Sequence, residues 1–417
     1  MVNRKANRWI YPLMGLIISA MLGGIYAFSL YYPPLQEAYN LNVVSPLALA
    51  FSIITISYSL FIIPAGVIYD RLGPRIPVVS GACVIFSGYI LGWYMQNFED
   101  WERAALLYYI GLGFLPGLGI ALVDAVPRPL ASKWFPDKTG TAVGTVAFGF
   151  GIGAAVVTPI IKYFLTQGVF LTFLYMGSIY FVVISLLGIF LREPPSEFRK
   201  LTPTNSEIEK SEDYSLIQAL KDKRFHILWF SFAFSSFAGL MVIGNAVPIL
   251  EESISPENLK LIIPTFLILT SFCNAGGRIF WGNLLDRMGP WRAMEMNFIV
   301  TVVALILLSF CYSNQYLVIP IGGVIYANYG GLLALFPSAV ALFFGKKYLG
   351  RIYGAVFTSW GVAGLMGAVG GGYIRDLTGS YFQAFYVAVV FSILALFLVY
   401  RGSRIHKSEA QNRDRDF

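Results

Sequence analysis

Gly66-x-x-x-Asp70-Arg71-x-Gly73-Pro74-Arg75 follows the second of a series of long apolar runs, and Gly282-x-x-x-Asp286-Arg287-x-Gly289-Pro290-Trp291-Arg292 follows the eighth. The two stretches start 216 residues apart (282 minus 66) in a chain of 417 residues. A second related pair, GTAVGTVAFGFGIG at 140–153 and GRIYGAVFTSWGVA at 350–363, is offset by 210 (350 minus 140). Duplicated halves of this kind are typical of transporters that rock around a central site.

The composition is that of a membrane protein. Hydrophobic residues make up 57% of the chain and charged residues 13%, against about 25% charged residues in soluble domains. Backbone groups in lipid must form their hydrogen bonds internally, which favours helices, and about 20 apolar residues span a bilayer. We therefore predict an all-α membrane protein in which twelve transmembrane helices form two pseudo-symmetric six-helix bundles.

The apolar runs and one long polar stretch set the predicted boundaries. We expect an N-terminal bundle over 1–191, a cytoplasmic linker over 192–222, a C-terminal bundle over 223–405 and a cytoplasmic tail over 406–417. The predicted spans are 9–32, 45–69, 75–95, 103–131, 138–166, 169–191, 223–250, 259–285, 292–312, 316–344, 350–374 and 380–400.

The basic residues predict the orientation. Of 30 lysines and arginines, 24 fall in segments on the side of the N-terminus, and four (Arg103, Lys162, Lys260 and Arg375) fall on the other side. Because cytoplasmic loops carry an excess of basic residues, we expect both termini in the cytoplasm of a multi-pass plasma-membrane protein. The net charge of +7 is then topogenic, and a nucleic-acid partner is not expected.

Metal and cofactor chemistry is not expected. The three cysteines lie in separate apolar runs, and there are only two histidines, so neither a disulfide framework nor a histidine-based metal site is predicted. The run GFGIG at 149–153 falls mid-helix, where small residues permit close helix crossing. We expect no cofactor, no enzymatic activity and a monomer in the lipid bilayer.

The charged residues of the duplicated loops suggest a role in holding one conformation of the protein. A carboxylate and arginines at helix ends can form charge-assisted bonds across the two halves, which would latch one conformation. The alternative is that these charges only enforce topology and a tight turn. The predicted gating residues are Gly66, Asp70, Arg71, Arg75, Gly282, Asp286, Arg287 and Arg292.

The duplicated motif, with twelve spans split six and six, resembles the major facilitator superfamily over the whole chain. Four stretches resemble the oxalate:formate antiporter family and the related monocarboxylate transporters. The resemblance implies alternating access and small carboxylate substrates. The stretches are GGIYAFSLYYPPL (23–35), KWFPDKTGTAVG (133–144), NAGGRIFWGNLLDRMG (274–289) and LFPSAVALFFGKKYLGRIYG (335–354).

Arg278 is the leading candidate for substrate binding. It precedes Asp286 by eight residues, or about 12 Å of helix at 1.5 Å per residue, so it lies inside the bilayer. A buried arginine there costs at least about 2.5–3.5 kcal/mol and should face a cavity or a partner. Its planar fork of donors matches a carboxylate. The resemblance implies that this arginine binds the substrate carboxylate; the alternative is packing against backbone carbonyls.

Two neighbouring positions bear on coupling and on substrate charge. Asn274 lies one turn before Arg278, where the monocarboxylate transporters carry an aspartate linked to proton coupling, so coupling through Asn274 is not expected, although it can donate a hydrogen bond. Trp360 aligns with a lysine of the oxalate antiporter branch. One cation, Arg278, suits a monoanion better than oxalate; the alternative for Trp360 is simple packing, as at Phe150.

Asp124 is the second candidate for coupling, since an acid in a transporter cavity is a proton-relay candidate. Related sequences tend to have a tyrosine at this position. Arg128 at i+4 offers a local ion pair instead, and Pro127 and Pro129 distort that turn. Both readings of Asp124 stay open.

Aromatic and amide side chains in the first and tenth spans complete the candidate site. Hydroxyl donors and apolar walls there could cage a small carboxylate, although each residue could equally be core. These residues are Tyr26, Phe28, Tyr326, Asn328 and Tyr329.

The function we predict is secondary transport of small organic anions. The preferred substrate is a monocarboxylate such as lactate, pyruvate or formate, and its transport is coupled to protons or to a counter-anion. The alternatives are an oxalate or dicarboxylate antiporter, or a drug or amphiphile exporter on the same fold. A membrane enzyme or sensor would need a catalytic cluster or an added domain, which the sequence lacks.

Overall fold

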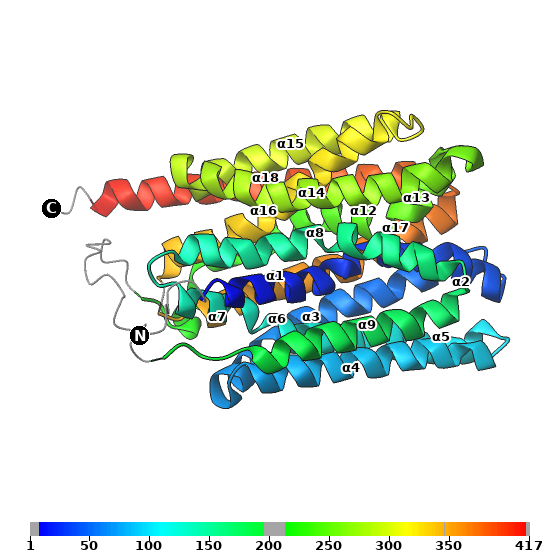
Figure 1. The fold of residues 1–417 in the computed structure, drawn as a ribbon. Helices are drawn as coiled ribbons and strands as arrows, with labels where there is room; N and C mark the ends of the chain where they lie inside the picture. The colour runs from blue at the N-terminus through cyan, green and yellow to red at the C-terminus, as the bar shows by residue number, and fades with distance from the viewer. Residues whose placement is uncertain (1–7, 196–212, 346, 414–417) are drawn as a thin grey trace.

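The computed structural model describes residues 8–195, 213–345 and 347–413 (Figure 1). Most of the predicted linker, 196–212, and the end of the predicted tail, 414–417, lie outside the described residues. Every regular element in the described part is helical, and twelve stretches are long and apolar enough to cross a membrane. The prediction of an all-α membrane protein with twelve spans is therefore confirmed.

The elements fall into two sets. The first half contains α1 (Ile10–Leu22), the 3-10 helix η1 (Gly23–Tyr31), α2 (Tyr32–Tyr39), α3 (Ser45–Leu72), α4 (Arg75–Tyr94), η2 (Met95–Asn97), α5 (Trp101–Tyr108), the π-helix η3 (Tyr109–Phe114), α6 (Leu115–Asp124), α7 (Pro127–Trp134), α8 (Thr139–Leu165) and α9 (Val169–Phe190). The second half contains α11 (Leu216–Lys221), α12 (Lys223–Gly244), α13 (Ala246–Ser253), α14 (Pro256–Met288), α15 (Pro290–Cys311), α16 (Val318–Phe344), α17 (Leu349–Thr378) and α18 (Phe382–Arg413).

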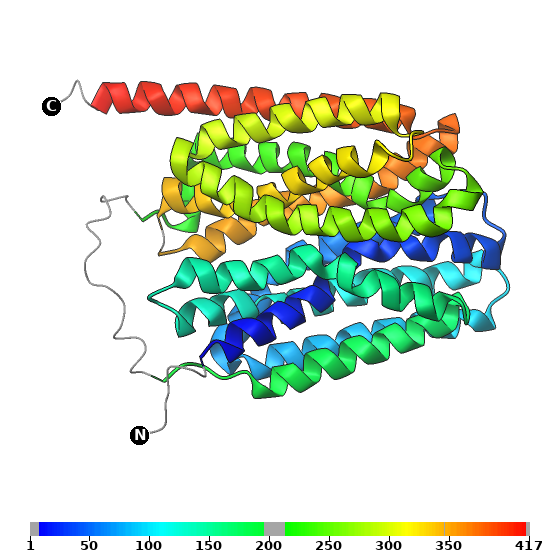
Figure 2. The ribbon, with the colours of Figure 1, turned by 45° about the horizontal axis from the view of Figure 1, so that its top comes forward.

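The packing of the helices repeats from one half to the other. In the first half α1 packs on α8, α3 on α6 and α4 on α9, and the equivalent pairs in the second half are α12 with α17, α14 with α16 and α15 with α18. The halves meet along α3 with α17 and α8 with α14, two contacts that the same symmetry relates. Figures 1 and 2 show the halves side by side, blue to green against green to red.

Repeat-equivalent glycines lie at both contacts between the halves. A Cβ on Gly151 of α8 would lie 2.6 Å from the Cα of Ala275, and one on Gly361 of α17 would lie 1.8 Å from the Oγ of Ser59. Glycine at these points lets the helix backbones approach closely, as in other membrane interfaces. The 210-residue repeat therefore marks where the halves touch.

Three of the spans are not continuous α-helices. The first contains η1, a nine-residue 3-10 segment, although such runs rarely exceed about four residues. The fourth contains η3 and breaks before Pro127, because proline lacks an N–H and restricts the preceding residue. The seventh, predicted as continuous over 223–250, is interrupted at Asn245, whose amide donates to the carbonyls of Met241 and Ala368. Broken helices of this kind line the sites of many transporters.

We name the two ends of the bundle by the chain. The terminal face holds Arg8 and the end of α18, and the distal face holds the loops before α3 and after α17 (Figure 1). Gly66, Gly140 and Gly350 lie toward the terminal face, and a Cβ on any of them would meet nothing within 4 Å. The structure therefore leaves open space at these three positions toward the terminal face.

Adjacent glycines on α14 offer a matched test of this packing. A Cβ on Gly277 would lie 1.9 Å from the carbonyl oxygen of Ala327 on α16, whereas one on Gly276 would meet nothing within 4 Å. We expect Gly277→Ala to destabilise the protein by about 1–3 kcal/mol through overpacking, and Gly276→Ala to leave stability unchanged or raised. Melting temperatures of the two purified variants in detergent check this; equal values would contradict the observed α14–α16 contact.

Candidate functional site

Arg278 lies at the centre of the molecule, on α14 where it crosses α8. Its side chain is buried, with 9% of the residue exposed. Nε donates a long hydrogen bond of 3.4 Å to Oδ1 of Asn274, one turn earlier on the helix. The guanidinium carbon lies 5.7 Å from the ring centroid of Phe150 on α8, and Nη2 is buried and has no hydrogen-bond partner among the residues that the structure describes. A buried donor left unpaired is costly, so this atom is suited to receive a ligand.

Arg278 borders a cavity of about 180 Å³ between the halves, which we call the central chamber. Both halves contribute charged, aromatic and small apolar side chains to its wall. The lining residues are Tyr26, Tyr58, Arg128, Val143, Ala147, Phe150, Arg278, Leu333, Pro337, Tyr353, Phe357 and Trp360.

A second cavity of about 250 Å³, the access chamber, adjoins the first and shares Tyr58, Arg128, Tyr353 and Phe357 with it. It also borders Gly66 and Gly350, which lie near the terminal ends of α3 and α17. The two chambers therefore form a path from Arg278 toward the terminal face.

The repeat explains much of the central chamber. Val143, Ala147 and Phe150 of α8 line it, and so do their equivalents 210 positions later, Tyr353, Phe357 and Trp360 of α17. The first half supplies small side chains at two of these positions and the second half supplies large rings. Phe357 and Trp360 stack with centroids 4.9 Å apart, so large aromatic rings form the chamber wall on that side.

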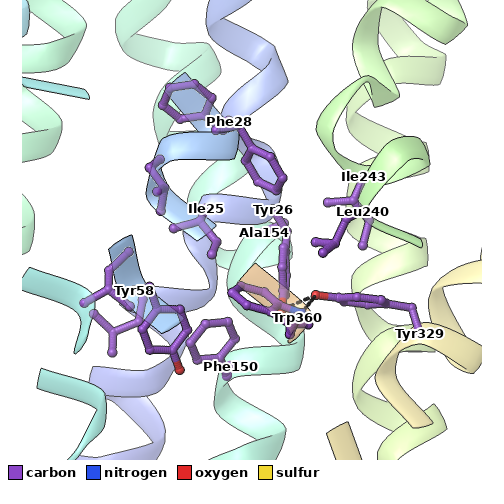
Figure 3. Packing of buried hydrophobic residues seen from close by; sticks show 14 of the residues in the cluster. Ile25, Tyr26, Phe28, Tyr58, Phe150, Ala154, Leu240, Ile243, Tyr329 and Trp360 are labelled. Carbon is purple, nitrogen blue, oxygen red and sulfur yellow. Dashed lines mark hydrogen bonds between the residues drawn. The ribbon is translucent and has the colours of Figure 1, made fainter. Parts of the chain in front are cut away.

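Three hydroxyl and indole groups bridge the halves beside the chamber. Tyr26 of η1 and Tyr329 of α16 have their hydroxyl oxygens 3.1 Å apart, and Trp360 Nε1 donates to the Tyr329 hydroxyl at 2.8 Å (Figure 3). The close approach of η1 to α8 requires Gly23, where a Cβ would lie 2.1 Å from the carbonyl oxygen of Phe150. The glycine pair that begins η1 thereby positions Tyr26.

Asp124 and Arg128 form an ion pair across the break between α6 and α7. Arg128 Nη2 donates to both carboxylate oxygens, at 2.8 and 2.7 Å, and the Tyr58 hydroxyl donates to Oδ2. The Asp124 side chain is 2% exposed and that of Arg128 is 32% exposed. The predicted local pair is therefore formed, and the same arginine lines both chambers.

Four of the predicted substrate-binding residues are not among those that line the central chamber: Phe28, Asn274, Asn328 and Tyr329. Asn274 and Tyr329 lie beside it, hydrogen-bonded to the lining residues Arg278 and Trp360. Phe28 packs against Tyr31 and Tyr108 inside the first half, away from Phe150 and Trp360 (Figure 3). Asn328 is held within the second half, accepting from Trp281 Nε1 and donating to the Thr301 hydroxyl. Each side chain leaves its helix in a different direction from its neighbours Tyr26 and Tyr329.

Other lining residues were not singled out in the sequence. Tyr58, Tyr353 and Phe357 line both chambers. The signal for the last two was the 210-residue offset, which relates them to Val143 and Ala147. Tyr326 is buried against Phe266, and its hydroxyl has no hydrogen-bond partner.

The duplicated loops lie at the terminal face. Gly73 and Gly289 have φ of 74° and 82°, a conformation that favours glycine, so both motifs form tight turns there. Asp70 and Asp286 are exposed and form no hydrogen bond or ion pair with any other described residue. Arg75 Nε donates to the carbonyl of Leu191 within the first half. In this conformation the loops do not join the halves.

The distal face is closed by bonds between the halves. The Asp376 carboxylate at the end of α17 accepts from the backbone N–H groups of Val44 and Ser45, at 2.9 and 2.8 Å, where α3 begins. Ser52 donates to the carbonyl of Gly364 at 3.0 Å. A carboxylate at a helix N-terminus satisfies free N–H groups and favours the helix dipole. The chambers are therefore sealed from the distal face.

Comparison with known proteins gives a consistent result. The sequence matches the Major Facilitator Superfamily over residues 13–328 and again over 228–416. It is 28% identical to the oxalate:formate antiporter of Oxalobacter formigenes over 94% of this chain and 90% of that one. It is 25% identical to monocarboxylate transporter 13 of Rattus norvegicus, over 92% and 86%. The fold is similar to that of a bacterial homologue of the human lysosomal transporter Spinster, with a TM-score of 0.70, 15% identity and coverage of 95% and 97%.

Removing the Asp376 cap should shift the protein toward a conformation with an open distal face. Asp376→Ala removes the acceptor of two N–H groups, worth about 1–2 kcal/mol, so the population with an open distal face should rise roughly 5- to 30-fold. Spin labels on exposed Glu37 and Gln383 should then report longer distances. The matched control is Asp100→Ala, which removes an exposed distal carboxylate 3.9 Å from Arg103 within one half. Identical distance distributions in both variants would contradict the role of the cap.

Proposed function

The chain belongs to the major facilitator superfamily, as its resemblance predicted, and on that premise we propose that it carries small organic monoanions of the lactate, pyruvate or formate type by alternating access. Its fold and its relatives are those of transporters and not of enzymes. The finer assignment, to monocarboxylates, starts from Arg278.

The buried Arg278 guanidinium carries this proposal. Its Nη2 has no hydrogen-bond partner among the described residues, and Arg278 lines a chamber between the two halves. An uncompensated cation inside the bilayer is expensive, and a carboxylate supplies both the opposite charge and matching acceptors. Asn274 beside it has a buried Nδ2 without a partner, which can donate a further hydrogen bond to the same carboxylate. Tyr26, Tyr329 and Trp360 form the polar edge of the proposed site.

The size and charge of the central chamber favour a small monoanion. The central chamber beside Arg278, at about 180 Å³, is smaller than the roughly 300–1,000 Å³ of drug-sized pockets, so the space next to the guanidinium suits a small ligand. Of the two arginines that line the chamber, Arg128 is already neutralised by Asp124. The second candidate function, exchange of oxalate or another dicarboxylate, is favoured by the presence of Arg128 itself and by the oxalate:formate antiporter as a relative.

The distribution of contacts suggests how the cycle proceeds. We take the terminal face as cytoplasmic, because 24 of the 30 basic residues fall on that side, and the membrane as the plasma membrane. The conformation described here then faces inward. In the opposite state the Asp376 cap breaks, and the loops that carry Asp70 and Asp286 close against the other half as a latch.

Coupling has two candidate forms. Protonation of Asp124, which contacts Tyr58 and Arg128, would link proton movement to the anion. Exchange for a counter-anion needs no titrating group in the chamber. The two differ in whether an imposed pH gradient drives uptake.

Removing the guanidinium tests the proposed site. We expect Arg278→Gln to weaken binding of lactate, pyruvate and formate at least about 30-fold. Removing one partner of a buried charge pair costs about 2 kcal/mol or more, and each tenfold loss of affinity corresponds to about 1.4 kcal/mol. Isothermal titration calorimetry of the purified protein measures this. Arg103→Gln, at an exposed site on the distal face, should bind as the wild type does. Unchanged affinity in Arg278→Gln would refute the proposal.

The coupling prediction uses labelled lactate, pyruvate, formate and oxalate in proteoliposomes, with and without a pH gradient. If Asp124 relays protons, the gradient accelerates wild-type uptake several-fold and has no effect on Asp124→Asn, which keeps counterflow. Gradient-driven uptake that survives in Asp124→Asn removes Asp124 from coupling. Counterflow without any pH dependence in the wild type indicates exchange.

A further inference from the structure

Two guanidinium groups from opposite halves line the central chamber. Arg128 comes from α7 and Arg278 from α14, and both border the same cavity. Each has a buried nitrogen that finds no hydrogen-bond partner in the described part of the chain, Nε in Arg128 and Nη2 in Arg278. Donors from both sides of one cavity are the arrangement that a ligand with two anionic ends would use.

Asp124 occupies one of these two cations. Both of its carboxylate oxygens accept from Arg128 Nη2, and Oδ2 also accepts from Tyr58. The carboxylate borders the access chamber but not the central chamber. Asp124 therefore neutralises the charge of Arg128 from the side of the access chamber, while Arg128 still lines the central chamber.

No other acid among the described lining residues can take over this role. Besides the two arginines and Asp124, the ionisable side chains that line either chamber are Tyr26, Tyr58 and Tyr353. The helices packed around α6 and α7 carry further ionisable groups among the described residues, and none of these lines a chamber; they are Tyr11, Tyr69, Asp70, Arg71, Arg75, Cys83, Tyr89, Tyr94, Tyr109, Lys162 and Tyr163.

The charge of the lined space follows from these three groups. Arg278 contributes one positive charge, and the Asp124–Arg128 pair contributes none. Charges interact strongly in a low dielectric, and an uncompensated charge there is costly. A bound monoanion brings the site to neutrality, whereas a dianion leaves it with an excess negative charge. Neutralising Asp124 reverses this preference, because Arg128 then also needs a counter-charge.

We propose that Asp124 is the residue that determines the charge of the accepted anion: while ionised it occupies Arg128 and restricts the central chamber to monoanions, and once neutral it releases Arg128 for the second carboxylate of a dianion. The inference rests on the proposed function, since it requires that Arg278 holds the first carboxylate. It makes Asp124 a specificity-determining position of this chain.

Oxalate and oxamate test the inference, because they match in shape and size and differ by one charge. The measurement is the ratio of their dissociation constants at neutral pH, from isothermal titration calorimetry of the full-length purified protein. The wild type should bind oxamate more tightly than oxalate. In Asp124→Asn the ratio should shift toward oxalate by at least about tenfold. The reason is that Arg128 then forms one further charge-assisted pair with oxalate, and a tenfold change in affinity corresponds to about 1.4 kcal/mol. Because inactive protein affects the measurements of both probes equally, partial misfolding of a variant does not change the ratio of the two dissociation constants.

Two further variants assign the shift to Arg128. The double variant Asp124→Asn with Arg128→Gln removes the released cation and should return the ratio toward the wild-type value. Asp137→Asn is the matched control, because Asp137 pairs with Arg8 at 2.8 Å outside both chambers. The hydrogen bond from Arg8 holds the pKa of Asp137 below its usual value, so this control also removes an ionised partner of an arginine. Its oxalate to oxamate ratio should equal that of the wild type.

The outcomes separate the inference from the proposed function. If Asp124→Asn still binds both probes with the wild-type ratio, or if the double variant keeps the shifted ratio, the role of Asp124 is refuted and the carboxylate site at Arg278 stands. If the wild type binds neither probe nor any monocarboxylate, the proposed function fails first. A shift that appears in Asp124→Asn and vanishes in the double variant supports the inference.

Discussion

Charge is expensive inside a hydrocarbon layer, and this cost organises the centre of the molecule. The described spans hold Asp124, Arg128 and Arg278 deep in the bundle, and all three border the chambers between the halves. None faces lipid, where an ion would have to be paired or hydrated. The helices around these three residues are interrupted, or they carry glycine at points where two helix backbones approach closely. The close contacts at glycine and the charged chamber are therefore two results of one constraint.

The duplication gives the chain symmetric contacts but an asymmetric site. Gly151 and Gly361 hold equivalent crossings, yet the chamber wall has Val143 and Ala147 on one side and Tyr353 and Phe357 on the other. Arg278 likewise corresponds to Ile62, 216 positions earlier, which lines only the access chamber. The halves have kept the residues that set their packing and diverged in the residues that meet the chamber. A carrier built in this way can rock symmetrically while binding its cargo from one preferred side.

The fold followed from composition and spacing, because twelve apolar runs and a charged linker allow few other arrangements. Arg278 could also be found, since a lone arginine in an apolar run is conspicuous. Tyr58, Tyr353 and Phe357 could not be selected by type, because 25 tyrosines and 34 phenylalanines fill lipid-facing, core and cavity positions alike. Phe28 and Asn328 show a second limit. Each lies within two residues of a side chain at the interface between the halves, but helical rotation turns it toward the core of its own half.

The 3-10 segment η1 has a geometric consequence for the first span. A 3-10 helix rises about 2.0 Å per residue with three residues per turn, against about 1.5 Å and 3.6 in an α-helix. Over the nine residues from Gly23 to Tyr31, rewinding to α-helical geometry would shorten the span by about 4.5 Å and unwind it by about half a turn. Tyr26 would leave Tyr329, and α2 would swing about the axis of α1. A change between these two helix geometries within η1 would therefore rotate the part of the first span that lies beyond it.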